Sequence, residues 1–376
     1  MTPKIEKFLA QNAPQAPCLV VDMDVIEGQY VSLDQGMADA DIYYAVKANP
    51  APQILQRLVK LGAKFDAASL NEIQMCLDAG ATPDDISYGN TLKKADAIQA
   101  AHELGITLFA FDSEGELDKI AEHAPGAKVY CRILTENGNA EWPLSRKFGC
   151  VPDMAVDLLA SAPGKGLVAF GLSFHVGSQQ PDPHQWGWAI NHAADVFQRL
   201  FEKGVELQVL NMGGGFPAQY RDMIDPFVKF AETINAALVE HFGENVPALM
   251  IEPGRAIVAE AGVLMSEVVL VSKKREDAPR RWVYLDVGMF GGLAETMGEA
   301  IKYNFITPHD GGDMGPVAIA GPTCDGADIL YEQTLVQLPL ALKTGDRVLI
   351  EPAGAYTTTY ASVGFNGFLP MDEYYI

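Results

Sequence analysis

The chain of 376 residues is 48% hydrophobic and 20% charged, which is typical of a globular protein with one large core or two domains. Its formal net charge of −22 excludes the basic surface needed to bind nucleic acid or an anionic membrane. No apolar run reaches the roughly 20 residues of a membrane span, and residues 1–17 lack the apolar stretch of a signal peptide. The five cysteines stand far apart without a C-x-x-C pair, which indicates reduced thiols and neither a disulfide framework nor a zinc site. We therefore expect a cytoplasmic protein without metal, nucleic-acid or membrane partners.

Eight segments in the first 252 residues are predicted as strands, because they are β-branched, aliphatic or aromatic runs of strand length. They are, in chain order, residues 42–46, 63–68, 86–90, 107–112, 128–133, 167–174, 205–211 and 248–252. Helical patterns lie between most of them, among them 52–62, 69–80 and 225–243. Ser69 and Asp225 are the predicted N-caps of the last two.

Strands that alternate with helices predict a parallel sheet, either doubly wound or closed as a (β/α)₈ barrel, and the unbroken rhythm favours the barrel. After residue 260, strand-like segments follow with little helix between them, which predicts an antiparallel β-sandwich or barrel. The early segment 17–22 can pair into that second domain. The expected domains are therefore a barrel over 24–262 and a β domain made of 1–23 and 263–376.

Chemically capable residues stand at the predicted carboxyl ends of the barrel strands, where barrel enzymes place their active sites. They are Lys47, Asp66, Asn90, Arg132, His175, the three glycines 213–215 and the segment 252–255. Each alone has a simpler explanation; Lys47, for example, can be a lysine that merely meets water at a strand end. Their convergence on one barrel mouth favours a functional site.

The loops after the seventh and eighth strands are predicted to bind phosphate, as barrels often do there. They read GGGFP (213–217) and EPGR (252–255). Glycines let backbone N–H groups approach an anion, and Arg255 adds a bidentate donor. The glycines also match a dinucleotide fingerprint, but Pro217 and the polar residues after it delay the next helix, which disfavours that interpretation.

A phosphate cradle, a strand-end lysine, a carboxylate and a histidine in one mouth fit pyridoxal 5′-phosphate (PLP). The lysine would hold the cofactor as a Schiff base, and the carboxylate would protonate the ring nitrogen and make the ring an electron sink. In this interpretation Lys47 is directed into the barrel mouth to carry the cofactor.

Seven motifs support a family resemblance. In chain order they are YAVKAN (44–49), FDAAS (65–69), SFHVGS (173–178), GGGFP (213–217), EPGR (252–255), GPTCDGAD (321–328) and GAYT (354–357). With them, nearly the whole chain resembles the ornithine decarboxylase branch of the alanine-racemase-like (fold type III) PLP enzymes, in a short bacterial-type form. YAVK and EPGR also admit the diaminopimelate and arginine decarboxylases, whereas GPTCDGAD is more specific to ornithine and lysine decarboxylases.

The resemblance implies a role for each matching residue. Lys47 binds the cofactor covalently, and Cys324 protonates the carbon that CO₂ has left. Asp325 binds the distal ammonium of the substrate, and so does Glu299, where the family often has aspartate. The remaining cofactor contacts implied are Asp66 in support of the pocket, His175 stacked on the ring, Glu252 at the ring nitrogen, and Ser178, Gly214, Gly215, Arg255 and Tyr356 at the phosphate. The family also implies a homodimer in which Cys324 and Asp325 reach the partner's active site.

The expected activity is therefore PLP-dependent decarboxylation of a basic amino acid, L-ornithine to putrescine or L-lysine to cadaverine, in polyamine biosynthesis. The two substrates differ by one methylene, worth only about 1–3 kcal/mol in a pocket, so the sequence does not separate them. One departure concerns Pro143, which stands where eukaryotic members carry an arginine; with Arg146 nearby, no cofactor role is assigned there.

Two alternatives stay open. A decarboxylase of diaminopimelate or arginine would share most motifs, but a diaminopimelate enzyme needs a cation for the substrate's far carboxylate. GPTCDGAD offers only Asp325 and Asp328, which have the right sign for an ammonium. A non-catalytic relative that binds a regulatory partner would typically have lost Lys47 or Cys324, and both are present.

Overall fold

The computed structural model describes residues 1–135 and 147–376 and divides the chain into two compact units. The barrel unit consists of Glu27–Pro217 and Ile224–Gly254, and the β unit of Met1–Ile26, Ala218–Met223 and Arg255–Ile376. The domain boundaries taken from the sequence stay a prediction. Within the described residues, no helix has both the length and the apolar character required of a membrane span.

The barrel unit is a closed barrel of eight parallel strands in sequential order. They are β2 (Ala40–Ala45), β3 (Lys64–Ala67), β4 (Ile86–Tyr88), β5 (Leu108–Phe111), β6 (Lys128–Arg132), β7 (Val168–Ser173), β8 (Val209–Asn211) and β9 (Ala248–Ile251). The barrel closes where β2 pairs with β9, with Ala40 opposite Leu249. Each strand overlaps a segment predicted from the sequence, so the barrel prediction is confirmed.

Apolar side chains from five different strands fill the barrel. They form one buried cluster of Tyr43, Leu108, Ala110, Tyr130, Val209 and Met250. The hydroxyl of Tyr130 lies 2.8 Å from the Ser87 hydroxyl, so its polar end is satisfied inside the core. The barrel is thus a packed core, and only its ends can hold a ligand.

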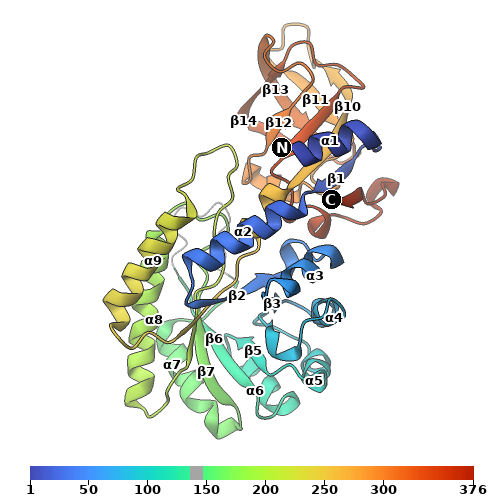
Figure 1. Ribbon diagram of the computed structural model, residues 1–376. Helices are drawn as coiled ribbons and strands as arrows, with labels where there is room; N and C mark the ends of the chain where they lie inside the picture. Colours follow the sequence, from blue (N-terminus) through green and yellow to red (C-terminus); the bar gives the residue numbers. More distant parts are fainter. Residues whose placement is uncertain (136–146) are drawn as a thin grey trace. The chain divides into compact units, whose positions relative to one another are not determined.

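Helices follow the strands around the outside of the barrel (Figure 1). They are α3 (Pro52–Lys60), α4 (Leu70–Asp78), α5 (Ala95–Glu103), α6 (Glu114–His123), α7 (Pro152–Ser161), α8 (His184–Glu202) and α9 (Phe227–Phe242), with α2 (Met23–Gly36) preceding β2. Ser69 caps α4 as predicted, because its side chain accepts the N–H of Glu72. The N-cap predicted at Asp225 is wrong: Pro226 takes that position, and the Asp225 carboxylate instead pairs with Lys229 at 2.7 Å.

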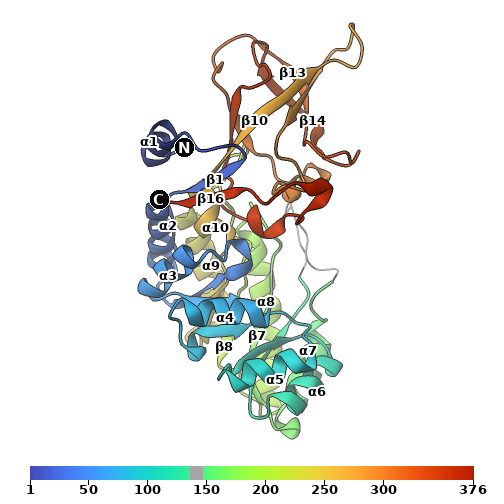
Figure 2. The same cartoon turned by 90° about the vertical axis from the view of Figure 1, so that its right-hand side faces the viewer.

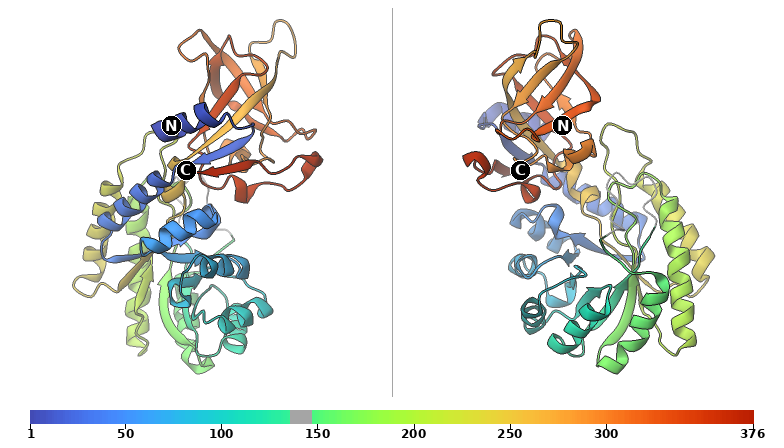
Figure 3. Two further views of the ribbon diagram at one scale, coloured as in Figure 1. Left: turned by 45° about the vertical axis from the view of Figure 1, so that its right-hand side comes forward. Right: turned by 180° about the vertical axis from the view of Figure 1, so that it is seen from behind.

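The β unit contains an eight-stranded sheet in the order β12-β15-β10-β11-β13-β14, to which β1 and β16 are joined. Most of the β unit is drawn in orange and red, with the amino-terminal β1 in blue (Figures 2 and 3). The strands are β1 (Cys18–Val21), β10 (Gly262–Ser272), β11 (Arg281–Leu285), β12 (Asn304–Ile306), β13 (Met314–Ala320), β14 (Ile329–Pro339), β15 (Arg347–Glu351) and β16 (Asp372–Tyr375). Most neighbours are antiparallel, but β11 with β13 and β1 with β16 are parallel. The predicted antiparallel domain is thus a mixed sheet.

The amino-terminal segment belongs to this sheet, as predicted. β1 pairs with β10, so that Cys18 lies opposite Met265. The helix α1 (Pro3–Asn12) covers these strands, and its Ile5 is buried against Cys18 and Val263. Strands from both ends of the chain therefore stabilise the same β unit.

Candidate active site

Lys47 lies directly after the carboxyl end of β2, in a short 3₁₀ helix of residues Val46–Ala48. Nearly half of its side-chain surface, 47%, is exposed, whereas β2 itself is largely buried. Its Nζ lies 3.4 Å from Oδ2 of Asp66 on the neighbouring strand β3. The strand-end lysine therefore stands at the barrel mouth beside a buried carboxylate.

Asp66 is a buried carboxylate whose second oxygen lacks a partner. The residue is 4% exposed, and its Oδ1 makes no hydrogen bond to any residue that the structure describes. Gly89 passes so close that a Cβ there would lie 1.8 Å from Oδ1. Because an unsatisfied buried oxygen is unfavourable, a ligand that donates a hydrogen bond would be stabilised here.

Asn211 connects the second carboxylate of the mouth to the glycine loop. It ends β8, is fully buried, and donates from Nδ2 to Oε1 of Glu252 at 2.5 Å. Its Oδ1 accepts the N–H of Gly213 at 2.9 Å. One amide therefore orients both Glu252, which directly follows β9, and the first glycine. Sequence analysis missed this residue, although its position at a strand end was a signal.

Glu252 sits in an environment that favours its protonated form. Burial raises the pKa of Glu252 to about 7, and the negative charge of Asp66 adds to this rise. Lys47, the hydrogen bond from Asn211 and Arg132 lower the pKa by smaller amounts. A cation placed beside this carboxylate would stabilise its charged form.

His175 follows β7 and is held as a neutral ring. Burial lowers the pKa of His175 well below 6.5, and the positive charges of Arg132 and Lys47 lower it further. Its Nδ1 accepts the N–H of Gly177 at 3.0 Å, which places the ring proton on Nε2. A flat, uncharged imidazole can pack against a cationic aromatic ring without charge repulsion.

The glycines 213–215 follow β8 and leave no room for side chains. A Cβ on Gly214 would lie 2.5 Å from the carbonyl oxygen of Glu252. Gly215 has a φ of +101°, and a Cβ on it would lie 2.4 Å from the carbonyl oxygen of Gly177. Glycine is thus required here because the loops after β7, β8 and β9 pack backbone against backbone. Loops without side chains also leave N–H groups uncovered, which is a property of phosphate-binding loops.

A ring stack and a backbone hydrogen bond hold this loop in place. Phe216 stacks on the buried Trp186 of α8, with ring centroids 4.8 Å apart. The carbonyl of Gly215 accepts the N–H of Gln180 at 2.9 Å, so the loops after β7 and β8 are joined. Ser178, a predicted phosphate ligand, lies in the first of these two loops.

A second group of predicted residues lies in the β unit around Arg255, the first residue of α10 (Arg255–Val258). Its guanidinium binds both carboxylate oxygens of the buried Glu295, at 2.5 and 2.7 Å, and the Tyr220 hydroxyl at 2.8 Å. The ring of Tyr356 lies 5.0 Å from the guanidinium carbon. The structure thus brings together Arg255 and Tyr356, two of the predicted phosphate ligands. No sequence motif indicated their neighbours Glu295 and Tyr220.

The segment 321–328 forms the connection between β13 and β14. Within it Asp328 is buried, and its carboxylate accepts the N–H of Met289 at 2.8 Å and the N–H and hydroxyl of Thr323 at 3.1 and 2.8 Å. Cys324 and Asp325 are exposed on the same turn. Asp328 is therefore a structural residue, and the turn presents the predicted thiol and carboxylate.

Glu299 makes contacts that differ from those implied by the resemblance. Its carboxylate accepts the backbone N–H groups of Glu332 and Gln333 at 2.7 Å and of Thr334 at 2.5 Å. Although burial acts in the opposite direction, these hydrogen bonds lower the pKa of Glu299. The carboxylate thus supports β14, and its substrate role stays a prediction. Pro143 and Arg146 lie outside the described residues.

The residues described above belong to a known type of domain. Residues 23–259 match the model of the pyridoxal-dependent decarboxylases, pyridoxal binding domain. The chain belongs to this family. The resemblance taken from the seven motifs and the PLP cofactor predicted from the sequence are confirmed.

Relatives of this pyridoxal-dependent decarboxylase match over nearly its whole length. A lysine/ornithine decarboxylase from Selenomonas ruminantium is 35% identical over 98% of this chain and 91% of its own. Antizyme inhibitor 2 from Xenopus laevis is 32% identical over 98% of this chain and 82% of its own. The crystal structure of a lysine/ornithine decarboxylase from Vibrio vulnificus, complexed with cadaverine, has a TM-score of 0.88 and 32% identity, with 99% of this chain and 97% of that one covered.

The barrel mouth of the decarboxylase fits PLP on three counts. The unpartnered Oδ1 of Asp66 can accept a hydrogen bond, the charged form of Glu252 would be stabilised by a protonated ring nitrogen, and Gly214 and Gly215 have no side chains of their own to cover their backbone N–H groups. Lys47 supplies a half-exposed amine beside them.

We expect Glu252 to make the stability of the cofactor-free protein depend on pH. Its pKa is 4.5 in an unperturbed chain and about 7 here, so this contribution is fully present below about pH 4.5 and is lost as pH rises through about 7. The Glu252→Gln variant has no titrating group at position 252. Its free energy of unfolding, relative to that of the wild type, should therefore increase by about 2 kcal/mol from about pH 5 to about pH 8. Urea denaturation of the two proteins at both pH values measures this difference.

The control for Glu252→Gln is Glu244→Gln, on the exposed loop after α9. Its difference from the wild type should be the same at both pH values. A pH-independent difference for Glu252→Gln as well would contradict the raised pKa.

We expect Gly215→Ala to destabilise the protein more than Gly166→Ala. Both glycines have positive φ, 101° and 79°, so both variants lose roughly 1 kcal/mol from the backbone. Only at Gly215 does the new Cβ collide with backbone, which should add about 1–3 kcal/mol and abolish PLP retention. Denaturant midpoints and bound PLP after gel filtration measure both effects; equal losses in the two variants would argue against a close-packed loop.

Proposed function

We propose that the protein decarboxylates L-ornithine, L-lysine or both to the corresponding diamine, putrescine or cadaverine, for polyamine biosynthesis. The observation that carries this proposal is the half-exposed Lys47 beside the buried Asp66 and close enough to Glu252 to lower its pKa, together with an exposed thiol at Cys324. Bound PLP supplies an aromatic ring that accepts the electron pair left behind when the substrate carboxylate departs as CO₂.

We assign the residues of the barrel mouth to cofactor binding. Lys47 holds the cofactor, Glu252 holds a proton at the ring nitrogen, and the neutral His175 packs on the ring face. Asp66 accepts a hydrogen bond through its unpartnered oxygen. Each assignment uses a group whose charge and contacts suit the role.

The phosphate is assigned to backbone and side-chain donors. The resemblance implies Ser178, Gly214, Gly215, Arg255 and Tyr356 for this role. The first three belong to the barrel unit and the other two to the β unit, and their convergence on one phosphate stays a prediction. The bidentate pair with Glu295 holds the Arg255 guanidinium in one orientation. Guanidinium and backbone N–H groups match the oxygens of a phosphate dianion.

The substrate side is assigned to the turn that carries Cys324. Asp325 is an exposed carboxylate, and the sequence GPTCDGAD contains no cation, so an ammonium suits this end better than a carboxylate. The Vibrio vulnificus relative was crystallised with cadaverine, a diamine. Cys324 would then donate its proton to the α-carbon after CO₂ has left.

A panel of substrates tests this function directly. We expect CO₂ release and diamine formation from ornithine, lysine or both, with a far lower kcat/KM for arginine and diaminopimelate. Lys47→Ala should lose turnover by more than about a thousandfold, since it removes the covalent anchor, while Lys64→Ala, on β3, should retain it. Preferred turnover of arginine or diaminopimelate would contradict the substrate assignment.

The relative named antizyme inhibitor 2 makes a non-catalytic, partner-binding protein the second candidate. Both Lys47 and Cys324 are present in this chain, which favours catalysis. A purified protein that retains PLP but turns over none of the four amino acids would favour the second candidate.

We also propose a cytoplasmic homodimer with shared active sites, in which Cys324 and Asp325 of one protomer serve the Lys47 site of the other. Mixing the inactive variants Lys47→Ala and Cys324→Ala should then restore activity. Complete subunit exchange at equal concentrations leaves about a quarter of all sites with both wild-type residues, because pairing is symmetric. If mass spectrometry shows exchange and activity stays at the level of the separate variants, the sites are not shared.

A further inference from the structure

The turn that carries Cys324 is held from two directions within the β unit. On one side, the buried Asp328 binds backbone and hydroxyl groups of the turn. On the other, the backbone N–H of Cys324 itself donates to Oδ1 of Asn366 at 2.8 Å. Asn366 lies 42 residues further along the chain, in the segment between β15 and β16, so this contact is a tertiary one.

Asn366 occupies a backbone conformation that normally calls for glycine. Its φ is +51° and its ψ is +17°, and its neighbours Gly364 and Gly367 also have positive φ. Asparagine is one of the few side chains that tolerate this region, but glycine is the usual choice. A residue that keeps a side chain here is informative when that side chain has a defined contact, and the Asn366 amide has one with Cys324.

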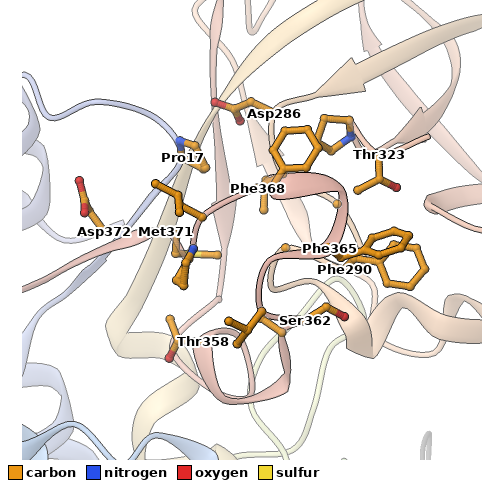
Figure 4. Close-up of a pocket in the computed structure, with 18 of the residues that line it drawn as sticks. Pro17, Asp286, Phe290, Thr323, Thr358, Ser362, Phe365, Phe368, Met371 and Asp372 are labelled. Atoms are coloured by element: carbon orange, nitrogen blue, oxygen red, sulfur yellow. The ribbon is translucent and has the colours of Figure 1, made fainter. Parts of the chain in front are cut away.

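The segment that contains Asn366 packs against the loop that supports Asp328. The ring of Phe365 packs against Phe290 with centroids 4.9 Å apart, and the two rings lie together in the pocket wall in Figure 4. The N–H of Ser362 donates to the carbonyl of Phe290 at 2.9 Å, and the neighbouring Met289 donates to Asp328. Both supports of the Cys324 turn thus rest on one short stretch of backbone.

We propose that Asn366 is a positioning residue for Cys324, and that its amide oxygen determines where the thiol can deliver a proton. The inference rests on the proposed role of Cys324 as proton donor. A cysteine side chain has a single torsion to its sulfur, so the backbone position restricts Sγ to three staggered places. Fixing the N–H of Cys324 therefore fixes the sulfur more effectively than it would fix a longer side chain.

The destination of the proton determines the product. When CO₂ leaves, the electron pair of the broken bond between the α-carbon and the carboxyl carbon stays on the substrate. A proton added at the α-carbon then gives the amine. A proton delivered to the cofactor instead gives, after addition of one water, an aldehyde, with the amino group left on the cofactor. The ratio of aldehyde to amine therefore reports the position of the thiol. A general loss of stability would lower the amount of active enzyme but would not change this ratio.

The test compares Asn366→Gly with Asn366→Asp in the holoenzyme. Glycine keeps the left-handed backbone and removes the acceptor, whereas aspartate keeps an oxygen in the same place. We expect Asn366→Gly to raise the aldehyde fraction severalfold and to lower kcat about three- to tenfold, the usual effect of one lost hydrogen bond. KM should change little, and Asn366→Asp should restore a low aldehyde fraction.

Hydrogen exchange gives a readout that does not depend on turnover. The Cys324 amide should exchange faster in Asn366→Gly than in the wild type and in Asn366→Asp. The matched control is Ala13→Gly, since Ala13 is another left-handed residue of the β unit, with φ +42°, after α1. It should leave the aldehyde fraction and the exchange of the Cys324 amide unchanged.

The outcomes separate this inference from the proposed function. A wild-type aldehyde fraction in Asn366→Gly, with a raised fraction in Cys324→Ala, would overturn the inference alone, as would unchanged exchange of the Cys324 amide. A wild-type aldehyde fraction in Cys324→Ala would overturn the role of Cys324 and the inference with it. A raised fraction in both variants, with rescue by Asn366→Asp, supports the inference.

Discussion

The structure depends most on two carboxylates, Asp66 and Glu252, that share one barrel mouth. Burial and mutual repulsion raise the pKa of Glu252 to about 7, and the positive charge of Lys47 opposes the rise only in part. Such a pair is unfavourable in an empty pocket and becomes favourable when a cation arrives, because each pKa shift is also a change in stability. The barrel strands and the Asn211 amide fix the positions of these charges, and a protonated ring beside them would be stabilised.

In the β unit, two exposed side chains lie on a fixed stretch of backbone. Cys324 and Asp325 lie on a turn whose other acidic residue, Asp328, points inward and accepts backbone N–H groups. Arg255 is held by Glu295 in a buried ion pair, whose desolvation is compensated by two-point geometry. In both places a buried carboxylate fixes a residue to which we assign a functional role.

The sequence predicted the barrel well because parallel strands buried on both faces are continuous apolar runs. It made Lys47 a candidate because several chemically capable residues stand at the strand ends that meet at one barrel mouth. It did not predict Asn211, Glu295 or Asn366, whose partners are 41, 40 and 42 residues away in the chain. Local pattern carries no information on contacts of that range, so the strand-end position of Asn211 could mark it as a candidate but could not identify its partners. The parallel pair of β1 with β16 escaped prediction for the same reason, and Asp225 was mistaken for a cap because Pro226 takes that position.

The central claim is that Lys47 at the barrel mouth carries the cofactor of this decarboxylase. Borohydride reduction of the purified holoenzyme fixes bound PLP to the lysine that holds it, and peptide mass spectrometry identifies that lysine. The account predicts the modification at Lys47, stoichiometric with bound PLP. Modification of another lysine, or release of all the cofactor as its free alcohol after reduction, would contradict it.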